Sequence, residues 1–173
     1  MVTDFHNSKT SIIIPSLNSP LIDQVVEKIL DQDGFGTQDE LIVVGRDDSG
    51  LIKGRSQVRF IDTGQPVTAP VARNIGIDAA EGELLIFIDS DCIPQAGWLE
   101  EHRKAHAAGY AVVGGGVLPA GDNYWHLVYN LTMFHEIFST APAGERPFLP
   151  TLNLSVERGV IAEVGKLDAT LKR

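Results

Sequence analysis

Two aspartates follow an apolar run in the middle of the chain, and their type and spacing suit a divalent cation. Leu84–Ile88 is apolar throughout, long enough for a strand buried on both faces and too short for a helix, and Asp89, Ser90 and Asp91 follow at once. Carboxylate oxygens are hard ligands for Mg²⁺ or Mn²⁺, and such a cation neutralises a diphosphate leaving group. The alternative is that Asp89 or Asp91 caps the helix announced by Pro94.

The elements around this pair predict a mostly parallel sheet with helices on its faces. Strands are predicted over 10–14, 40–44, 58–61 and 84–88, and helices over 21–34, 70–82 and 97–108. In such a sheet, ligands bind beyond the carboxyl ends of the strands. Three of these ends carry polar residues, at 15–18, 46–48 and 89–91, and we expect them to form one site. The same residue types also make ordinary turns, which is the competing interpretation, above all for 46–48.

The second half of the chain has a less regular pattern. A strand is predicted over 111–117, where three successive glycines (114–116) indicate close approach by another segment. An amphipathic segment is expected over 125–138, a strand over 149–156 and a short helix over 160–164. No repeat or linker divides the sequence, so a single domain over residues 1–173 is predicted.

Composition excludes several classes of protein. The formal net charge of -9 argues against a nucleic-acid partner. The single cysteine, Cys92, permits no internal disulfide, and without a partner motif it is expected to fill space rather than act as a nucleophile. No apolar stretch has the length of a membrane span or the pattern of a signal peptide. We expect a cytoplasmic protein, with any peripheral association at the inner face of the cell membrane made through segments outside this sequence.

Four motifs in this order resemble family 2 glycosyltransferases, which transfer a sugar from a nucleotide-sugar donor. They are SIIIPSLN at 11–18, ELIVV at 40–44, ARNIG at 72–76 and LIFIDSD at 85–91. LNLSV at 152–156 and VGKLD at 164–168 resemble the acceptor-side strand of the family and the turn after it. The resemblance covers residues 11–168 and implies an α/β protein, a three-layer α/β/α GT-A fold that is Rossmann-like, with a mostly parallel central sheet.

The resemblance also implies a role for each matching residue. Asp91 would be the direct ligand of Mn²⁺ or Mg²⁺, with Asp89 near the ribose and the metal. The implied nucleotide-sugar contacts are Pro15, Ser16, Asn18, Asp47, Arg73, Asp89 and Ser90. The acceptor-side residues would be Asn153 and Trp125. Leu17 stands where the family often has an aromatic residue. The family usually has paired aspartates that contact the base directly after its second strand, whereas here Gly45 and Arg46 come between that strand and Asp47.

Other interpretations of three of these side chains stay open. Arg73 could form a salt bridge to a neighbouring acid instead of binding the donor diphosphate. Trp125 could be a packing group instead of a stacking surface for a sugar. His102 and His106 have the i, i+4 spacing of a zinc pair, but Glu101, Arg103 and Lys104 beside them favour a solvated helix face.

The implied activity is that of a hexosyltransferase in polysaccharide biosynthesis at the cell envelope. It would move a sugar from a nucleotide-sugar donor, with a UDP-sugar favoured, to a saccharide or lipid-linked acceptor, with inversion. The catalytic general base of the family would lie beyond Arg173, so the chain is expected to be truncated before it, and Glu163 and Asp168 are expected to be structural. One alternative is a catalytically incomplete nucleotide-sugar-binding module; another is a sugar nucleotidyltransferase, which normally has a glycine-rich, basic first loop. Apolar surface exposed by such a truncation would favour a homo-oligomer.

Overall fold

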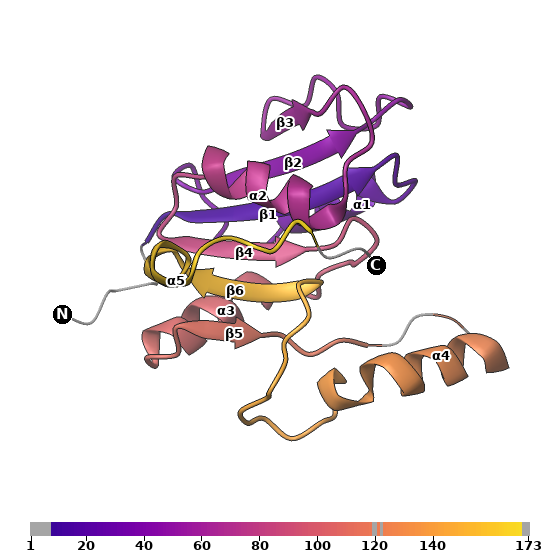
Figure 1. The fold of residues 1–173 in the computed structure, drawn as a ribbon, viewed down its shortest axis with the longest axis vertical. Coiled ribbons are helices and arrows are strands. Elements are labelled where there is room, and N and C mark those ends of the chain that lie inside the picture. Colours follow the sequence, from indigo (N-terminus) through magenta and orange to yellow (C-terminus); the bar gives the residue numbers. More distant parts are fainter. Residues whose placement is uncertain (1–7, 119–120, 122, 171–173) are drawn as a thin grey trace.

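The protein is built on one six-stranded sheet, seen in a computed structural model that describes residues 8–118, 121 and 123–170 (Figure 1). The strand order is β3-β2-β1-β4-β6-β5. The parallel strands are β1 (Thr10–Leu17), β2 (Glu40–Arg46), β3 (Val58–Asp62) and β4 (Leu84–Ile88). Strand β6 (Asn153–Glu157) runs antiparallel to β4, and β5 (Val112–Gly114) runs antiparallel to β6. The prediction of a mostly parallel sheet is confirmed.

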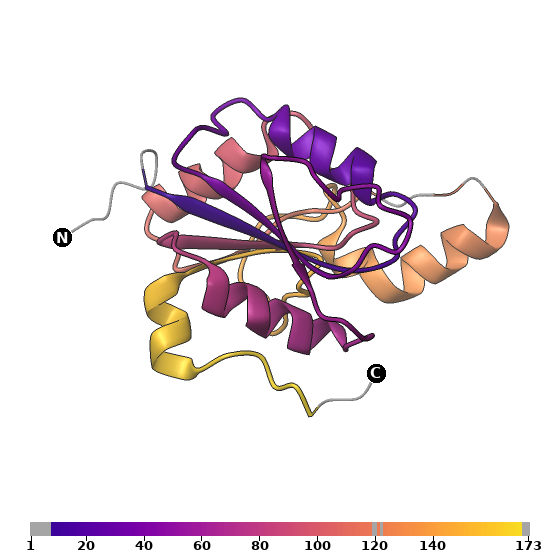
Figure 2. The same cartoon turned by 90° about the horizontal axis from the view of Figure 1, so that it is seen from above.

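Helices cover both faces of the sheet and make three layers (Figure 2). Helices α1 (Ile22–Leu30) and α3 (Trp98–Ala107) pack on one face. Helices α2 (Ala69–Ala79) and α5 (Arg158–Val164) pack on the other. Helix α1 buries Ile22, Val25 and Ile29, whose spacing places them on one stripe of the helix. The predicted α/β/α class is therefore confirmed.

The first strand is buried on both sides because its side chains alternate between the two layers. Ile12 and Ile14 join the core beneath α1, whereas Ile13 joins the core beneath α2. A Cβ atom added to Gly76 of α2 would lie 2.4 Å from Cγ2 of Ile13. Only a glycine therefore lets α2 lie this close to the sheet, and this approach places the start of α2 beside the ends of β1 and β4.

Two predicted strands in the second half are shorter than the sequence pattern indicated. β6 begins at Asn153 instead of residue 149, because Leu149 packs against Gly114 before the chain enters the sheet. β5 ends at Gly114, and the Gly115 amide still donates to the carbonyl oxygen of Asn153 at 2.9 Å. Cβ atoms built on residues 114–116 would lie 2.2 to 2.8 Å from three different segments, which confirms the predicted close approach.

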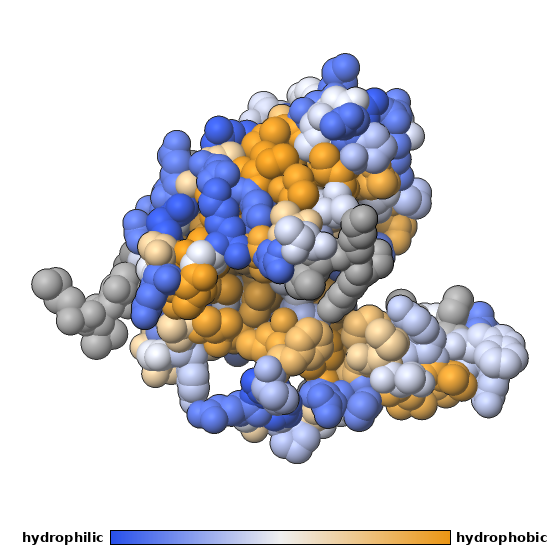
Figure 3. Space-filling view, in the orientation of Figure 1, coloured by the Kyte–Doolittle hydropathy of each residue, from blue (hydrophilic) through white to orange (hydrophobic). Residues whose placement is uncertain are grey.

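Helix α4 (Tyr124–Phe134) and the short 3-10 helix η1 (His135–Ile137) extend away from the layered body (Figure 1). The predicted segment 125–138 is thus helical over most of its length. Its large apolar side chains are exposed, and part of the helix surface is hydrophobic in Figure 3. Within the described residues, no helix has the length and apolarity needed to cross a bilayer.

Candidate functional site

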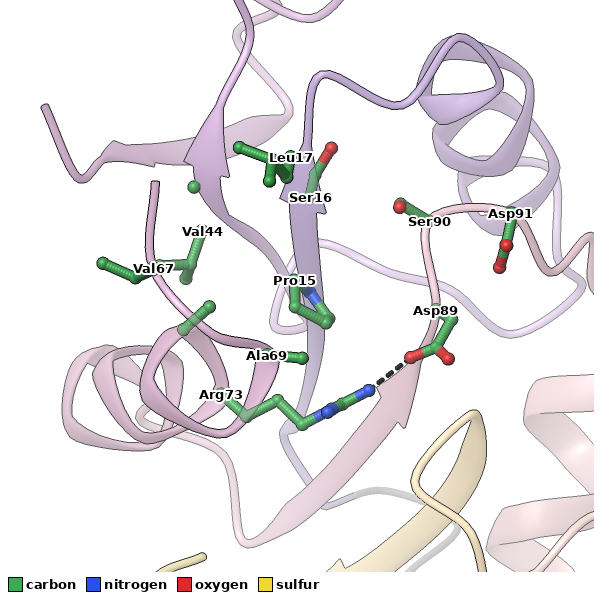
Figure 4. Close-up of a pocket in the computed structure, with 12 residues that line it drawn as sticks. Pro15, Ser16, Leu17, Val44, Val67, Ala69, Arg73, Asp89, Ser90 and Asp91 are labelled. Carbon is green, nitrogen blue, oxygen red and sulfur yellow. Dashed lines mark hydrogen bonds and ion pairs between the residues drawn. The ribbon is translucent and has the colours of Figure 1, made fainter. Parts of the chain in front are cut away.

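A pocket of about 310 Å³ opens at the carboxyl ends of β1, β2 and β4 (Figure 4). It lies where the parallel strands end and α2 begins, the position at which ligands bind in open α/β sheets. The lining residues are Pro15, Ser16, Leu17, Val44, Gly45, Val67, Ala69, Ala72, Arg73, Asp89, Ser90 and Asp91. The structure thus brings Pro15, Ser16, Arg73, Asp89, Ser90 and Asp91 together, as the sequence predicted.

One end of the pocket is charged. Arg73 reaches from α2 toward the end of β4, and its Nη2 donates to Oδ1 of Asp89 (Figure 4). Arg73 is only 6% exposed, and its buried Nε has no hydrogen-bond partner within the described residues. Burial raises the pKa of the Asp89 carboxyl, Arg73 opposes this rise, and the nearby charge of Asp91 adds to it. The alternative of a salt bridge is therefore realised, but inside the pocket, so the guanidinium is held at the place where a ligand would enter.

A tight turn presents Ser90 and Asp91 beside Asp89. The Cys92 amide donates to the Asp89 carbonyl oxygen at 3.0 Å, which closes the turn. The Ser19 hydroxyl donates to the Ser90 carbonyl oxygen at 2.8 Å and ties the turn to the loop before α1. Helix α3 starts after Gly97 with no side-chain cap, so neither aspartate caps it. That structural alternative is excluded, and the two carboxylates have no role in helix capping.

The donor set of this turn fits a divalent cation only in part. Asp89 and Asp91 offer carboxylate oxygens, but the described residues contain no group of three or more His, Cys, Asp or Glu side chains that could enclose an ion. Mg²⁺ in particular is commonly held by one or two carboxylates, with water and substrate phosphates completing its coordination. The residues present therefore suit a cation that arrives with a diphosphate rather than a resident structural metal.

The opposite end of the pocket is apolar. Val44 and Val67 line it, and Figure 4 shows both on the far side of Pro15 from Asp91. A Cβ atom built on Gly45, whose φ is +141°, would lie 1.8 Å from the Ser16 carbonyl oxygen. No side chain can therefore stand at position 45. This end offers a flat apolar surface without a carboxylate.

Two predicted nucleotide contacts, Asn18 and Asp47, do not line the pocket. The Asp47 carboxylate accepts the backbone N–H groups of residues 51, 52 and 53, at 2.9 to 3.2 Å, and thereby builds its own loop. Asn18 lies in the left-handed region, with φ of 54°, and its side chain pairs with Asp48. The geometry gives these two residues structural tasks and offers no support for their contact with a nucleotide.

The predicted acceptor-side residues lie apart from the pocket lining. Asn153 is tied into the fold: its Oδ1 accepts from Trp98 Nε1 at 2.8 Å, and its Nδ2 donates to the Gly116 carbonyl oxygen at 3.1 Å. Trp125 is 76% exposed on α4, where its ring packs edge-on against Tyr124 with 5.3 Å between centroids. Trp125 is thus not a core packing group, and Asn153 is one of the groups that join β6 to α3.

The prediction of a solvated face for His102 and His106 is wrong. Both rings are buried between α3 and β6, and both lie 2.7 Å from the Ser155 hydroxyl. Burial lowers the pKa of each ring to about 4. The charged residues beside the two histidines on α3 suggested a solvated face. That inference fails because charged side chains can lie on either side of a buried stripe of a helix.

Cys92 and Asp168 were both expected to have structural roles. Burial, together with the charges of Asp91 and Asp89, raises the pKa of the Cys92 thiol to about 12, which is consistent with a space-filling residue. Asp168 accepts two hydrogen bonds from Thr170, at 2.7 and 2.8 Å, within its own turn. From the sequence, Ser19 was expected only to cap the first helix, and Val44 and Val67 were not assigned to the site, because small and apolar residues carry no chemical signature.

A mostly parallel sheet covered by helices on both faces, with a pocket at the carboxyl ends of its parallel strands, defines a fold of the GT-A type. The chain belongs to glycosyl transferase family 2, whose family model matches residues 11–163. Glycosyltransferase AglE of Haloferax volcanii is 32% identical over 95 residues, which cover 54% of this chain and 31% of that protein.

Two solved structures share the fold. The mannosyltransferase PcManGT from Pyrobaculum calidifontis, in complex with GDP-Man and Mn²⁺, matches with a TM-score of 0.69 at 16% identity, over 95% of this chain and 48% of that one. TarS 1–349 from S. aureus matches with a TM-score of 0.64 at 21% identity, over 90% of this chain and 48% of that one. This chain therefore spans about half the length of these structures and about a third of AglE.

Proposed function

We propose that the pocket binds a nucleoside-diphosphate sugar together with a divalent cation, as the donor site of a glycosyltransferase. The observation that carries this proposal is the distribution of charge in the pocket: Arg73, Asp89 and Asp91 lie at one end, and the rest of the lining carries no charged side chain. A nucleoside diphosphate has the same division, with a flat base at one end and two charged phosphates at the other. The relative that was solved with GDP-Man and Mn²⁺ supports this assignment.

Each charged residue has a distinct task in this proposal. The Arg73 guanidinium, with an unpartnered Nε, donates charge-assisted hydrogen bonds to a phosphate. Asp91 and the Asp89 oxygen that does not face Arg73 hold Mn²⁺ or Mg²⁺. When bound, the cation supplies stabilisation of the negative charge that develops on the departing diphosphate. Val44, Val67 and Leu17 provide the apolar surface for the base.

The family supports glycosyl transfer as the reaction, and we propose its acceptor and stereochemistry. The sugar passes to a saccharide or lipid-linked acceptor with inversion, for which a carboxylate base must take the proton of the acceptor hydroxyl. The described pocket contains no acid beyond Asp89 and Asp91, and both have other tasks. The base of the proposed reaction is therefore not among the residues that line the described pocket, and a non-catalytic donor-binding module is the second candidate function for this chain.

Thermal unfolding in the presence of nucleotides tests the donor site. The chain is melted with UDP, GDP, dTDP or CMP, each with and without MnCl₂. A nucleotide at a hundredfold excess over its dissociation constant adds about 2.7 kcal/mol, which shifts the melting temperature by several degrees. We expect a shift for one nucleotide that requires Mn²⁺ and that Asp91→Ala abolishes. Asp33→Ala, a change of an exposed aspartate in the loop after α1, is the matched control and should leave the shift intact.

The outcomes separate the candidates. If a folded wild-type chain shows no shift with any nucleotide, the donor-site proposal is refuted. If the chain binds a nucleotide but hydrolyses or transfers no sugar from the corresponding labelled donor, the binding-module candidate is favoured. Binding that persists undiminished in Asp91→Ala would refute the task given to the aspartate pair.

A further inference from the structure

The loops that frame the pocket are joined by two adjacent residues that do not line it. Asn18 and Ser19 follow β1 and lie between the loop after β2 and the turn after β4. The Asn18 amide N–H donates to the Arg46 carbonyl oxygen at 2.9 Å. The Asn18 side chain exchanges two hydrogen bonds with Asp48, from Nδ2 to Oδ2 and from the Asp48 amide to Oδ1, each at 2.8 Å.

The second of these residues holds the acidic turn. The Ser19 hydroxyl donates to the Ser90 carbonyl oxygen at 2.8 Å, midway between the two aspartates, and also accepts from the Leu21 amide at 3.4 Å. This links the first residues of α1 to the turn that carries Asp91. Asn18 thus holds the loop that directly follows Val44 and Gly45 of the pocket lining, and Ser19 holds the turn at the charged end.

The backbone at this junction is shaped for the task. Asn18 has a φ of 54°, a conformation that favours glycine and is tolerated by asparagine. This conformation turns the chain out of β1 so that successive side chains meet different loops. The loop after β2 is also attached to the end of β3. Arg46 forms an ion pair with Asp48, and its Nη1 lies 3.2 Å from Oδ1 of Asp62.

We propose that Asn18 and Ser19 are a positioning pair that sets the distance between the two ends of the pocket, so that nucleotide and cation bind cooperatively. The proposal rests on the proposed function, because it names what couples the two halves of that donor site. Neither side chain touches the ligand. A base seated against β2 orders the Asp48 loop and Asn18, and through Ser19 the same junction orders the turn whose carboxylates receive the cation.

Cooperativity is measured as the factor by which MnCl₂ tightens binding of the responding nucleotide, UDP or GDP, in calorimetric titrations. Linkage requires the nucleotide to tighten Mn²⁺ binding by the same factor. Ser19→Ala removes the neutral hydrogen bond to the Ser90 carbonyl oxygen, together with the long contact from the Leu21 amide, so we expect this factor to fall about fivefold. Asn18→Gly keeps the left-handed backbone but deletes the side-chain carboxamide that pairs with Asp48, and it should reduce this factor by a similar amount. Ser19→Thr restores a hydroxyl and should recover it, and Ser56→Ala, at an exposed site, is the control.

A second measurement needs no ligand and reads the coupling between loops directly. In amide hydrogen exchange, Ser19→Ala should accelerate exchange of the Asp48 amide, which Ser19 does not contact. Asn18→Gly should accelerate exchange of the Cys92 amide in the opposite loop. If each substitution accelerates amide exchange only in the loop that the substituted side chain contacts, the two loops are not coupled and the proposal is overturned.

The two proposals fail in different ways. If the wild type binds no nucleotide with Mn²⁺, the donor-site proposal fails, and the exchange of the Asp48 and Cys92 amides still decides whether the loops are coupled. If the wild type binds both ligands cooperatively and Ser19→Ala and Asn18→Gly retain the full factor, the positioning pair is refuted while the donor site stands.

Discussion

Acid should weaken the fold through its buried histidine rings, and the effect can be worked out for His102. Its Nε2 lies 2.9 Å from Asn153 Oδ1, and that oxygen already accepts from Trp98 Nε1. The network therefore assigns the ring proton to Nε2 and leaves Nδ1 to accept from the Ser155 hydroxyl at 2.7 Å. A second proton would have to bind Nδ1 and replace the hydrogen bond that the Ser155 hydroxyl donates there, and burial holds the pKa of the ring at about 4.

The size and sign of the effect follow from linkage. Above about pH 6.5 the ring is neutral in both the folded and the unfolded chain, so it has no influence on stability. As the pH falls from about 6.5 toward 4, the unfolded chain gains a proton that the folded chain refuses, so the free energy of unfolding decreases. With a folded pKa of about 4, the loss at pH 5 is about 2 kcal/mol.

Urea unfolding at pH 7 and pH 5 measures this loss. His102→Gln keeps a donor and an acceptor but has no ionisation, so its stability should fall by about 2 kcal/mol less than that of the wild type over this interval. His135→Gln, a change at an exposed histidine, controls for the titration of other groups. If His102→Gln and the wild type lose the same stability between the two pH values, the assignment of a neutral, buried ring is refuted.

Three further substitutions test individual features of the structure. Gly45→Ala should destabilise the protein by several kcal/mol in thermal melts, because the added Cβ would overlap a backbone carbonyl oxygen. Gly159→Ala is the control: the space around this position of α5 is open, and the change should stabilise the protein by up to about 1 kcal/mol. Equal effects of the two substitutions would contradict the close approach at position 45. Arg73→Lys should weaken nucleotide binding about tenfold in calorimetry, because an ammonium cannot reproduce the planar guanidinium beside Asp89; unchanged affinity would remove Arg73 from the site. Trp125→Ala should alter the free energy of unfolding by less than about 0.5 kcal/mol in urea titrations, and a larger loss would show that the ring is packed.

The sequence predicted the first half of the fold well because its signals are local. The apolar run Leu84–Ile88 and the helical stripe of α1 each report their own burial, and both elements lie within a few residues of the predicted bounds. The aspartates after β4 were singled out because they directly follow a buried strand, whereas Arg73 of α2 was singled out only through the resemblance to the family; the structure brings all three to one pocket. Their convergence follows from parallel topology alone.

Other features depend on contacts between distant segments, which periodicity does not encode. Nothing near Asp47 in the sequence shows that its carboxylate binds the amides that follow it. The burial of His102 is determined by β6, more than fifty residues later. Position 45 must be a glycine because of the carbonyl oxygen of a residue on the adjacent strand. For His102 and Gly45 the deciding partner lies on another element, and for Asp47 it is a loop conformation that periodicity does not describe.

The position of β6 has a consequence for the growing chain on the ribosome. Strands β1 to β4 and helices α1 to α3 are complete by residue 107, and they can assemble as soon as they emerge. In the described sheet, β5 pairs with β6 and not with β4, so it must wait about forty residues for its partner. During that interval the open edge of β4, an apolar strand, faces solvent and can pair with another nascent chain. Arrival of β6 covers this edge, so β6 is the strand of the described sheet that protects β4 against such pairing.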